Sequence, residues 1–132
     1  VINAIKNDDY KLIVVNFANG DMVGHTAVKS AIIEAMNELD KVLGEVVCEA
    51  IGANIATLIT ADHGNVDEIN NLKTGKPNTQ HSLNPVPCIV VDNKRDWSII
   101  KKDGGLSNIT PTILTLMGID KPKEMTSDSL IK

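Results

Sequence analysis

Aromatic side chains are almost missing from this chain of 132 residues, of which they make up 2%. Tyr10, Phe17 and Trp97 are single representatives of their kinds. Aliphatic side chains must therefore fill the core, a composition typical of a buried parallel sheet flanked by helices. The length suits one domain with one core, and the hydrophobic content of 42% is ordinary for a globular protein.

Cysteine is also scarce, with Cys48 and Cys88 the only two residues of this kind. They lie far apart and form no CxxC pair, which gives no sign of a redox motif or a thiolate metal site. Each stands among apolar neighbours in the sequence. We therefore expect two small buried thiols in a protein from a reducing compartment.

Long apolar runs and long basic runs are absent as well. No apolar stretch approaches the ~18–20 residues that a membrane span requires, and the sequence shows no signal-peptide pattern. We expect no membrane partner, with the cytoplasm as the default location. The net charge is −4, and no basic stretch or aromatic–basic alternation suits a nucleic-acid partner.

Several signatures of known chemistry are missing too. The sequence contains no GxGxxG after a predicted strand and no GxxxxGK[ST] loop, so nothing indicates a cradle for nucleotide phosphates. No serine stands in a GxSxG elbow, which leaves the nucleophile of one large hydrolase class without a candidate.

The patterns that are present indicate strands and helices in alternation. Short β-branched runs predict strands at residues 12–17, 56–60 and 86–91. Helical spacing predicts helices at residues 26–52 and 109–117, and a polar loop over residues 70–84 separates the last two strands. This order predicts a layered α/β fold with a mostly parallel sheet, which binds ligands at the carboxyl ends of its strands.

All three histidines of the chain lie next to predicted strand ends, and two of them have an aspartate close by. Asp21 and His25 follow the first strand, Asp62 and His63 follow the second, and His81 precedes the third. Mixed carboxylate and imidazole ligands suit Mn²⁺ or Zn²⁺.

Taken singly, Asp21 is better explained as a turn residue or helix cap and His81 as a solvated loop residue, whereas Asp62 and His63 are harder to explain in this way. If all the histidines were merely solvated, the chain would bind no metal. Their shared placement predicts a metal site. The spacing leaves open whether that site holds two ions or one ion with outer ligands.

Three stretches closely resemble signatures of the cofactor-independent (2,3-bisphosphoglycerate-independent) phosphoglycerate mutases. They are NFANGDMVGHT at residues 16–26, TADHGN at 60–65 and HSLNPVP at 81–87. The C-terminal part, with ITPTIL at 109–114 and KPKEM at 121–125, is similar to the end of that family. The resemblance runs in order over nearly the whole chain and implies a three-layer α/β/α, alkaline phosphatase-like fold.

The resemblance also implies ligands and chemistry. Asp21, His25 and His81 would bind one ion and Asp62 and His63 a second, the usual ions being Mn²⁺. In such isomerases a serine takes the phosphoryl group of 3-phosphoglycerate and returns it to the other hydroxyl of the bound glycerate. The product is 2-phosphoglycerate, and the reaction is a step of glycolysis.

The resemblance assigns residues 1–132 to the C-terminal portion of the metal-binding, phosphatase-like domain. The serine nucleophile, a further Asp ligand and an inserted substrate domain belong to parts of the family that these residues do not cover. We therefore expect no catalytic residue in this chain and no turnover by the chain alone. Smaller departures are Gly20 for a common proline, Ala27 for a common glycine, and Val66-Asp67 for a common Ala-Glu.

Two other functions remain open at this point. One is another enzyme of the alkaline phosphatase superfamily, such as a phosphopentomutase or a phosphatase, although the long match at residues 16–26 argues against it. The other is a non-catalytic fragment that binds metal and does nothing further.

Overall fold

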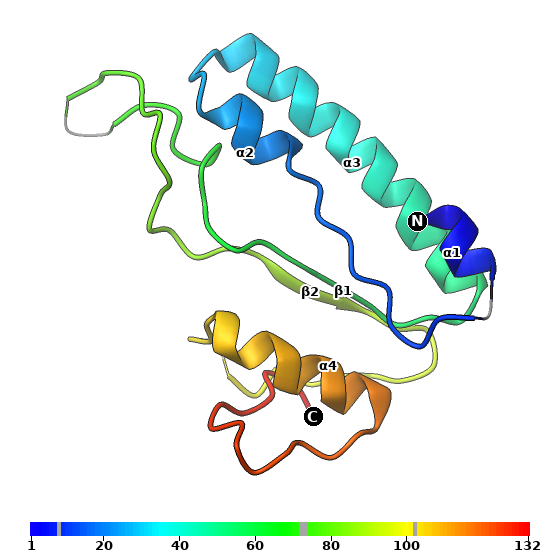
Figure 1. Ribbon diagram of the computed structural model, residues 1–132. Coiled ribbons are helices and arrows are strands. Elements are labelled where there is room, and N and C mark those ends of the chain that lie inside the picture. Colours follow the sequence, from blue (N-terminus) through cyan, green and yellow to red (C-terminus); the bar gives the residue numbers. More distant parts are fainter. Residues whose placement is uncertain (8, 72–73, 102) are drawn as a thin grey trace.

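The computed structural model describes residues 1–7, 9–71, 74–101 and 103–132. A long helix, α3 (Lys29–Gly52), and a two-stranded ladder of β1 (Thr57–Thr60) and β2 (Cys88–Val91) form its frame. Figure 1 shows α3 on one side of the ladder and α4 (Ile109–Met117) on the other. The remaining elements are short: α1 (Ile2–Lys6), α2 (Asn19–Gly24) and the 3-10 turn η1 (Leu106–Asn108).

The ladder is antiparallel, with Thr57 opposite Val91 and Thr60 opposite Cys88. The α/β class is confirmed, but the two strands differ from the parallel neighbours that the sequence pattern predicts. Parallel neighbours need a long crossover, usually through a helix. Here the chain doubles back through irregular structure between residues 61 and 87, which include the polar loop predicted at residues 70–84. Residues 72 and 73 of that loop lie outside the described part.

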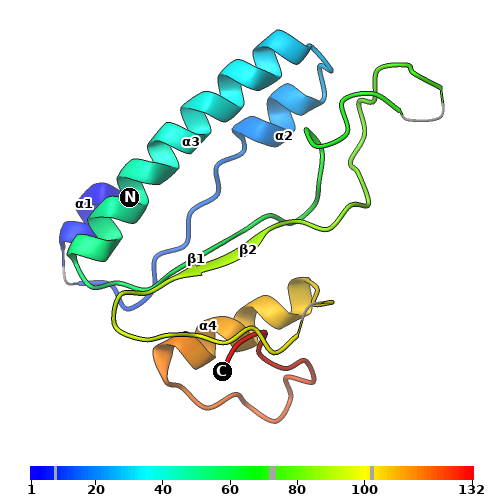
Figure 2. The same cartoon turned by 180° about the vertical axis from the view of Figure 1, so that it is seen from behind.

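The strand predicted at residues 12–17 is extended but pairs with no strand among the described residues, so this prediction is wrong. Figure 2, like Figure 1, shows the segment running between α3 and the ladder. Ile13 and Phe17 pack against the core, whereas Val14 points outward and is 80% exposed. The β-branched run specifies an extended backbone, but a strand also needs a neighbour to bond with.

A small aliphatic core joins α1 to α3, as the scarcity of aromatic residues predicts. Ile5, Val46 and Ala50 are its buried members. The expectation of buried thiols is wrong, because Cys48 and Cys88 are both free and exposed. Cys48 lies about 200° around the helix from Val46 and Ala50, since successive helical residues turn by about 100°.

The C-terminal part forms a second packed unit around α4. The helix ends at Gly118 with a left-handed φ of 67°, as predicted. Thr112 is fully buried, and its hydroxyl accepts a hydrogen bond of 2.9 Å from the backbone of Leu130. This bond fixes the end of the chain against α4. In the described part of the chain, no helix has both the length and the apolar character needed to cross a membrane.

The junction between α2 and α3 differs most from the sequence pattern. The turn predicted near Asn19 is the start of α2, and the helix predicted from Thr26 begins at Lys29. Ala27 separates the two helices with a φ of 51°. The Thr26 hydroxyl donates to the carbonyl of Val23 (2.6 Å) and accepts from the amide of Val28 (3.2 Å), which holds this tight turn.

We expect Ala27→Gly to stabilise the chain. A left-handed φ costs a residue with a Cβ roughly 1–2 kcal/mol, which glycine avoids. The greater freedom of glycine in the unfolded chain offsets about 0.5–1 kcal/mol of this stabilisation. Urea denaturation should therefore show a gain of about 0.5–1 kcal/mol in the free energy of unfolding. The matched control is Ala35→Gly within α3, which should lose about 0.5–1 kcal/mol. Equal losses in both variants would contradict the strain at Ala27.

Candidate metal centre

The short helix α2 and its C-cap residue place Asp21 and His25 on one face, because residues four apart in helical backbone are neighbours. The Nε2 atom of His25 lies 3.3 Å from Oδ1 of Asp21. Both side chains are partly open to solvent. An aspartate and a histidine placed in this way can bind the same metal ion.

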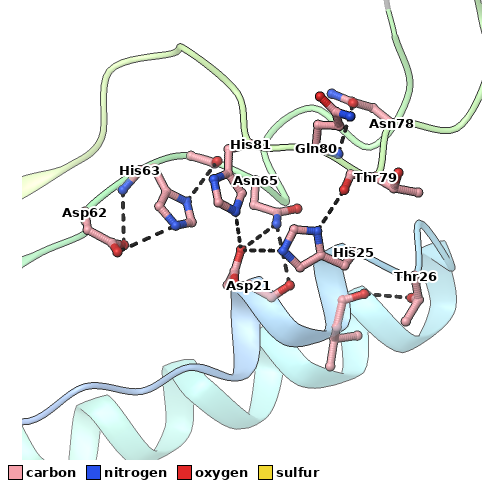
Figure 3. Close-up of polar contacts among 12 residues, drawn as sticks. Asp21, His25, Thr26, Asp62, His63, Asn65, Asn78, Thr79, Gln80 and His81 are labelled. Carbon is pink, nitrogen blue, oxygen red and sulfur yellow. Dashed lines mark hydrogen bonds and ion pairs between the residues drawn. The ribbon is translucent and has the colours of Figure 1, made fainter.

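The antiparallel ladder brings the other two histidines to the same place. Thr60, the last residue of β1, is opposite Cys88, the first residue of β2, so the segment after β1 and the segment before β2 leave the ladder at one end. His63 and His81 come from these two segments, and their rings stack with centroids 3.6 Å apart. Nε2 of His81 lies 3.2 Å from Oδ1 of Asp21 (Figure 3).

Asp21, His25 and His81 form a group that could hold a metal ion. One ligand atom from each of the three lies within 4.8 Å of the others. One carboxylate oxygen with two imidazole nitrogens suits a borderline divalent cation such as Mn²⁺ or Zn²⁺. The donor set therefore fits a resident metal.

A backbone carbonyl orients His25 within this group. Its Nδ1 atom lies 2.7 Å from the carbonyl oxygen of Thr79, a geometry in which Nδ1 carries the proton and donates (Figure 3). In the neutral imidazole this bond would leave the lone pair of Nε2 available as a ligand for a cation. Outer hydrogen bonds of this kind commonly fix the tautomer of a metal-binding histidine.

Asn65 orients the carboxylate of Asp21 and is the residue that sequence reasoning did not single out. The side chain is 7% exposed, and its Nδ2 donates to Oδ1 of Asp21 over 2.7 Å. Glycine at position 24 makes room for it, since a Cβ there would lie 2.2 Å from Oδ1 of Asn65. The hydrogen bond from Asn65 is the main cause that lowers the pKa of Asp21 below its ordinary value, and positive charge on the nearby imidazoles of His25 and His81 lowers it further.

Asp62 and His63 form a looser pair beside this group. Asp62 accepts a hydrogen bond of 3.1 Å from the backbone of His63, and its other oxygen lies 3.5 Å from Nε2 of the same residue. The Asp62 side chain is 76% exposed. Among the described residues, no second set of three ligand atoms lies as close together as the first.

Comparison with known proteins places this arrangement in a family. Residues 1–121 match the model of the metalloenzyme superfamily. The chain belongs to the metalloenzyme superfamily. This match and the similarity to a solved structure of a phosphoglycerate mutase together support an alkaline phosphatase-like fold.

The similar proteins are phosphoglycerate mutases. The 2,3-bisphosphoglycerate-independent phosphoglycerate mutase of Symbiobacterium thermophilum is 47% identical over 96% of this chain and 24% of its own length. That of Clostridium kluyveri is 44% identical over 100% of this chain and 26% of its own. The structure is similar to a Leishmania mexicana phosphoglycerate mutase crystallised at low cobalt concentration, with a TM-score of 0.88 and 33% identity over 99% of this chain and 26% of that one.

These matches confirm the resemblance to cofactor-independent phosphoglycerate mutases. The chain spans about a quarter of the length of the relatives that it matches.

We expect Asn65→Ala to raise the pKa of Asp21 toward its ordinary value, because the main hydrogen bond to the ionised carboxylate is lost. A lowered pKa in the folded state stabilises the fold above the pKa of the unfolded chain, and this contribution disappears as the pH falls through the folded pKa. The free energy of unfolding of the variant should therefore be lower than that of the unmodified chain above this acidic range, and the difference should shrink as the pH falls through it.

Carboxyl NMR titration of Asp21 measures this shift directly. Asn93→Ala is the control, because Nδ2 of Asn93 also donates hydrogen bonds, to Ile51 and Asn54, away from the site. An unchanged pKa of Asp21 in Asn65→Ala would show that the hydrogen bond does not set it.

Proposed function

We propose that this chain is the C-terminal, metal-ligating portion of the phosphatase-like domain of a cofactor-independent phosphoglycerate mutase. The observation that carries the proposal is the convergence of Asp21, His25 and His81 in a chain 47% identical to such a mutase over 127 residues. The whole domain would have three α/β/α layers with a mostly parallel sheet. The enzyme would act in glycolysis, in the cytoplasm.

Two Mn²⁺ ions are the proposed cofactors. Asp21, His25 and His81 would hold one ion, which their mutual distances support. Asp62 and His63 would contribute to the second, since His63 stacks on His81 and stands at the edge of the first group. An ion held by only these two side chains needs further ligands from outside residues 1–132, as the sequence resemblance also implies.

The proposed substrates are 2- and 3-phosphoglycerate. When bound, a pair of divalent cations neutralises charge on the phosphate oxygens and on the attacking and leaving oxygens. The residues of this chain would bind the cations and orient one another's ligand atoms. Asp21 supplies negative charge in a position that Asn65 fixes, and Thr79 keeps Nε2 of His25 free to ligate. The phosphoryl acceptor would be a serine outside these 132 residues.

Calorimetric titration with Mn²⁺ tests the ligand assignment. We expect saturable binding to the chain and its loss in Asp21→Ala, since Asp21 is the only carboxylate of the group. Asp128→Ala is the control, because Asp128 is an exposed aspartate that pairs with Lys121, a residue outside the group. Binding that survives in Asp21→Ala would refute the assignment.

A substrate assay on the full-length gene product tests the activity. We expect Mn²⁺-dependent interconversion of 3- and 2-phosphoglycerate, and no turnover by residues 1–132 alone. Preference for a phosphopentose over phosphoglycerate would instead identify a phosphopentomutase. Mutase turnover by the 132 residues alone would contradict the proposal that the phosphoryl acceptor lies elsewhere.

A further inference from the structure

We propose that Asp67 is a positioning residue that clamps the two loops bearing His63 and His81 and so sets how their rings face each other. This inference rests on the proposed function only in the metal-binding role of the two histidines. Asp67 itself lies outside the group of candidate ligands.

The clamp is made by a single carboxylate oxygen. Oδ2 of Asp67 accepts hydrogen bonds from Oγ of Ser82 and from Nδ2 of Asn84, each over 2.7 Å. Ser82 directly follows His81, and Asp67 lies four residues after His63. The carboxylate thus ties the segment after β1 to the segment before β2.

The backbone segments joined by these bonds also lie close together. The amide of Ser82 donates to the carbonyl of Gly64 over 2.9 Å, in an isolated antiparallel bridge. A Cβ on Gly64 would lie 2.2 Å from Oγ of Ser82 and 2.7 Å from Oδ1 of Asp67. Ser82 is only 6% exposed. The residue following each histidine is therefore held against the residue following the other.

Negative charge on Asp67 strengthens the clamp. Hydrogen bonds to an ionised acceptor are roughly twice as strong as neutral ones. The bonds from Asn84 and Ser82 in turn lower the pKa of Asp67, which keeps it ionised at neutral pH. Residues 61–87 contain no helix or strand in their described part. Side-chain bonds such as these, together with the isolated backbone bridge between Gly64 and Ser82, therefore hold the two loops against each other.

The consequence is the ring geometry of the site. The rings of His63 and His81 are nearly parallel, with an interplanar angle of 14°, whereas His25 and His81 are tilted by 43° at 5.2 Å. The bridge between Gly64 and Ser82 lies one residue beyond each stacked histidine, and the bonds of Asp67 hold this bridge in place, which accounts for the close, parallel pair.

Proton NMR of the metal-free chain tests the clamp without any assay of activity. The chain has three histidines, so the ring protons give three sets of signals, and stacking shifts those of His63 and His81 upfield. At a pH where imidazole is neutral, Asp67→Ala should move both signals toward unstacked positions and leave that of His25 in place. Ser82→Ala, which removes one donor and keeps the carboxylate, should move them in the same direction.

Two further variants separate positioning from general stability. Asp67→Asn keeps an acceptor oxygen in place and should retain most of the upfield shift. Asp92→Ala is the matched control, because Asp92 accepts hydrogen bonds of 2.8 Å from Lys94 and Trp97 away from the site. It should leave all three histidine signals unchanged. Unmoved His63 and His81 signals in folded Asp67→Ala would overturn the proposal.

Mn²⁺ titration of the same variants adds a functional readout. Removing a hydrogen-bond partner of a metal ligand typically lowers metal affinity 10–100-fold. Asp67 bonds to neighbours of the ligands and not to the ligands themselves. We expect a loss of about tenfold in Asp67→Ala and none in Asp92→Ala. Unchanged affinity in Asp67→Ala would overturn the link to metal binding. If the unmodified chain bound no Mn²⁺, the proposed function would fail, while the ring signals would still decide the clamp.

Discussion

One carboxylate oxygen, Oδ1 of Asp21, is the point on which three separate segments converge. Nε2 of His25 and Nε2 of His81 lie 3.3 and 3.2 Å from it, and Nδ2 of Asn65 donates to it. Helix α2, the segment after β1 and the segment before β2 each supply one of these groups. The charge at this position is what makes the polar cluster a candidate site for a cation.

Helix α3 and the antiparallel ladder position these segments around Asp21. Helix α3 supports α2 through the tight turn at Ala27, whose left-handed φ the chain accepts in order to reverse direction within a few residues. The antiparallel register of Thr60 with Cys88 delivers the other two segments to one end of the ladder. Long elements thus fix the ends of irregular segments, and hydrogen bonds through Asn65, Thr79 and Asp67 fix what lies between.

The antiparallel ladder also bears on the comparison with relatives. The chain matches about a quarter of their length, and its own extended segment at residues 12–17 lies beside α3 with no ladder partner among the described residues. A sheet with more strands would cover the apolar side chains that this segment exposes, such as Val14. The proposed parallel sheet of the whole domain is compatible with these two strands, since mixed sheets carry antiparallel pairs.

The sequence by itself determined the class of the fold, the end of α3 at Gly52, the extent of α4 and the residues to consider as ligands. These follow from local rules: helical periodicity, glycine at a helix end, and aspartate with histidine next to strand ends. Only the tertiary structure decided that β2 runs antiparallel to β1, that Cys48 and Cys88 are exposed, and that Asn65 and Asp67 support the site. Strand direction, burial and hydrogen-bond partners depend on segments far apart in the chain, so no local pattern specifies them.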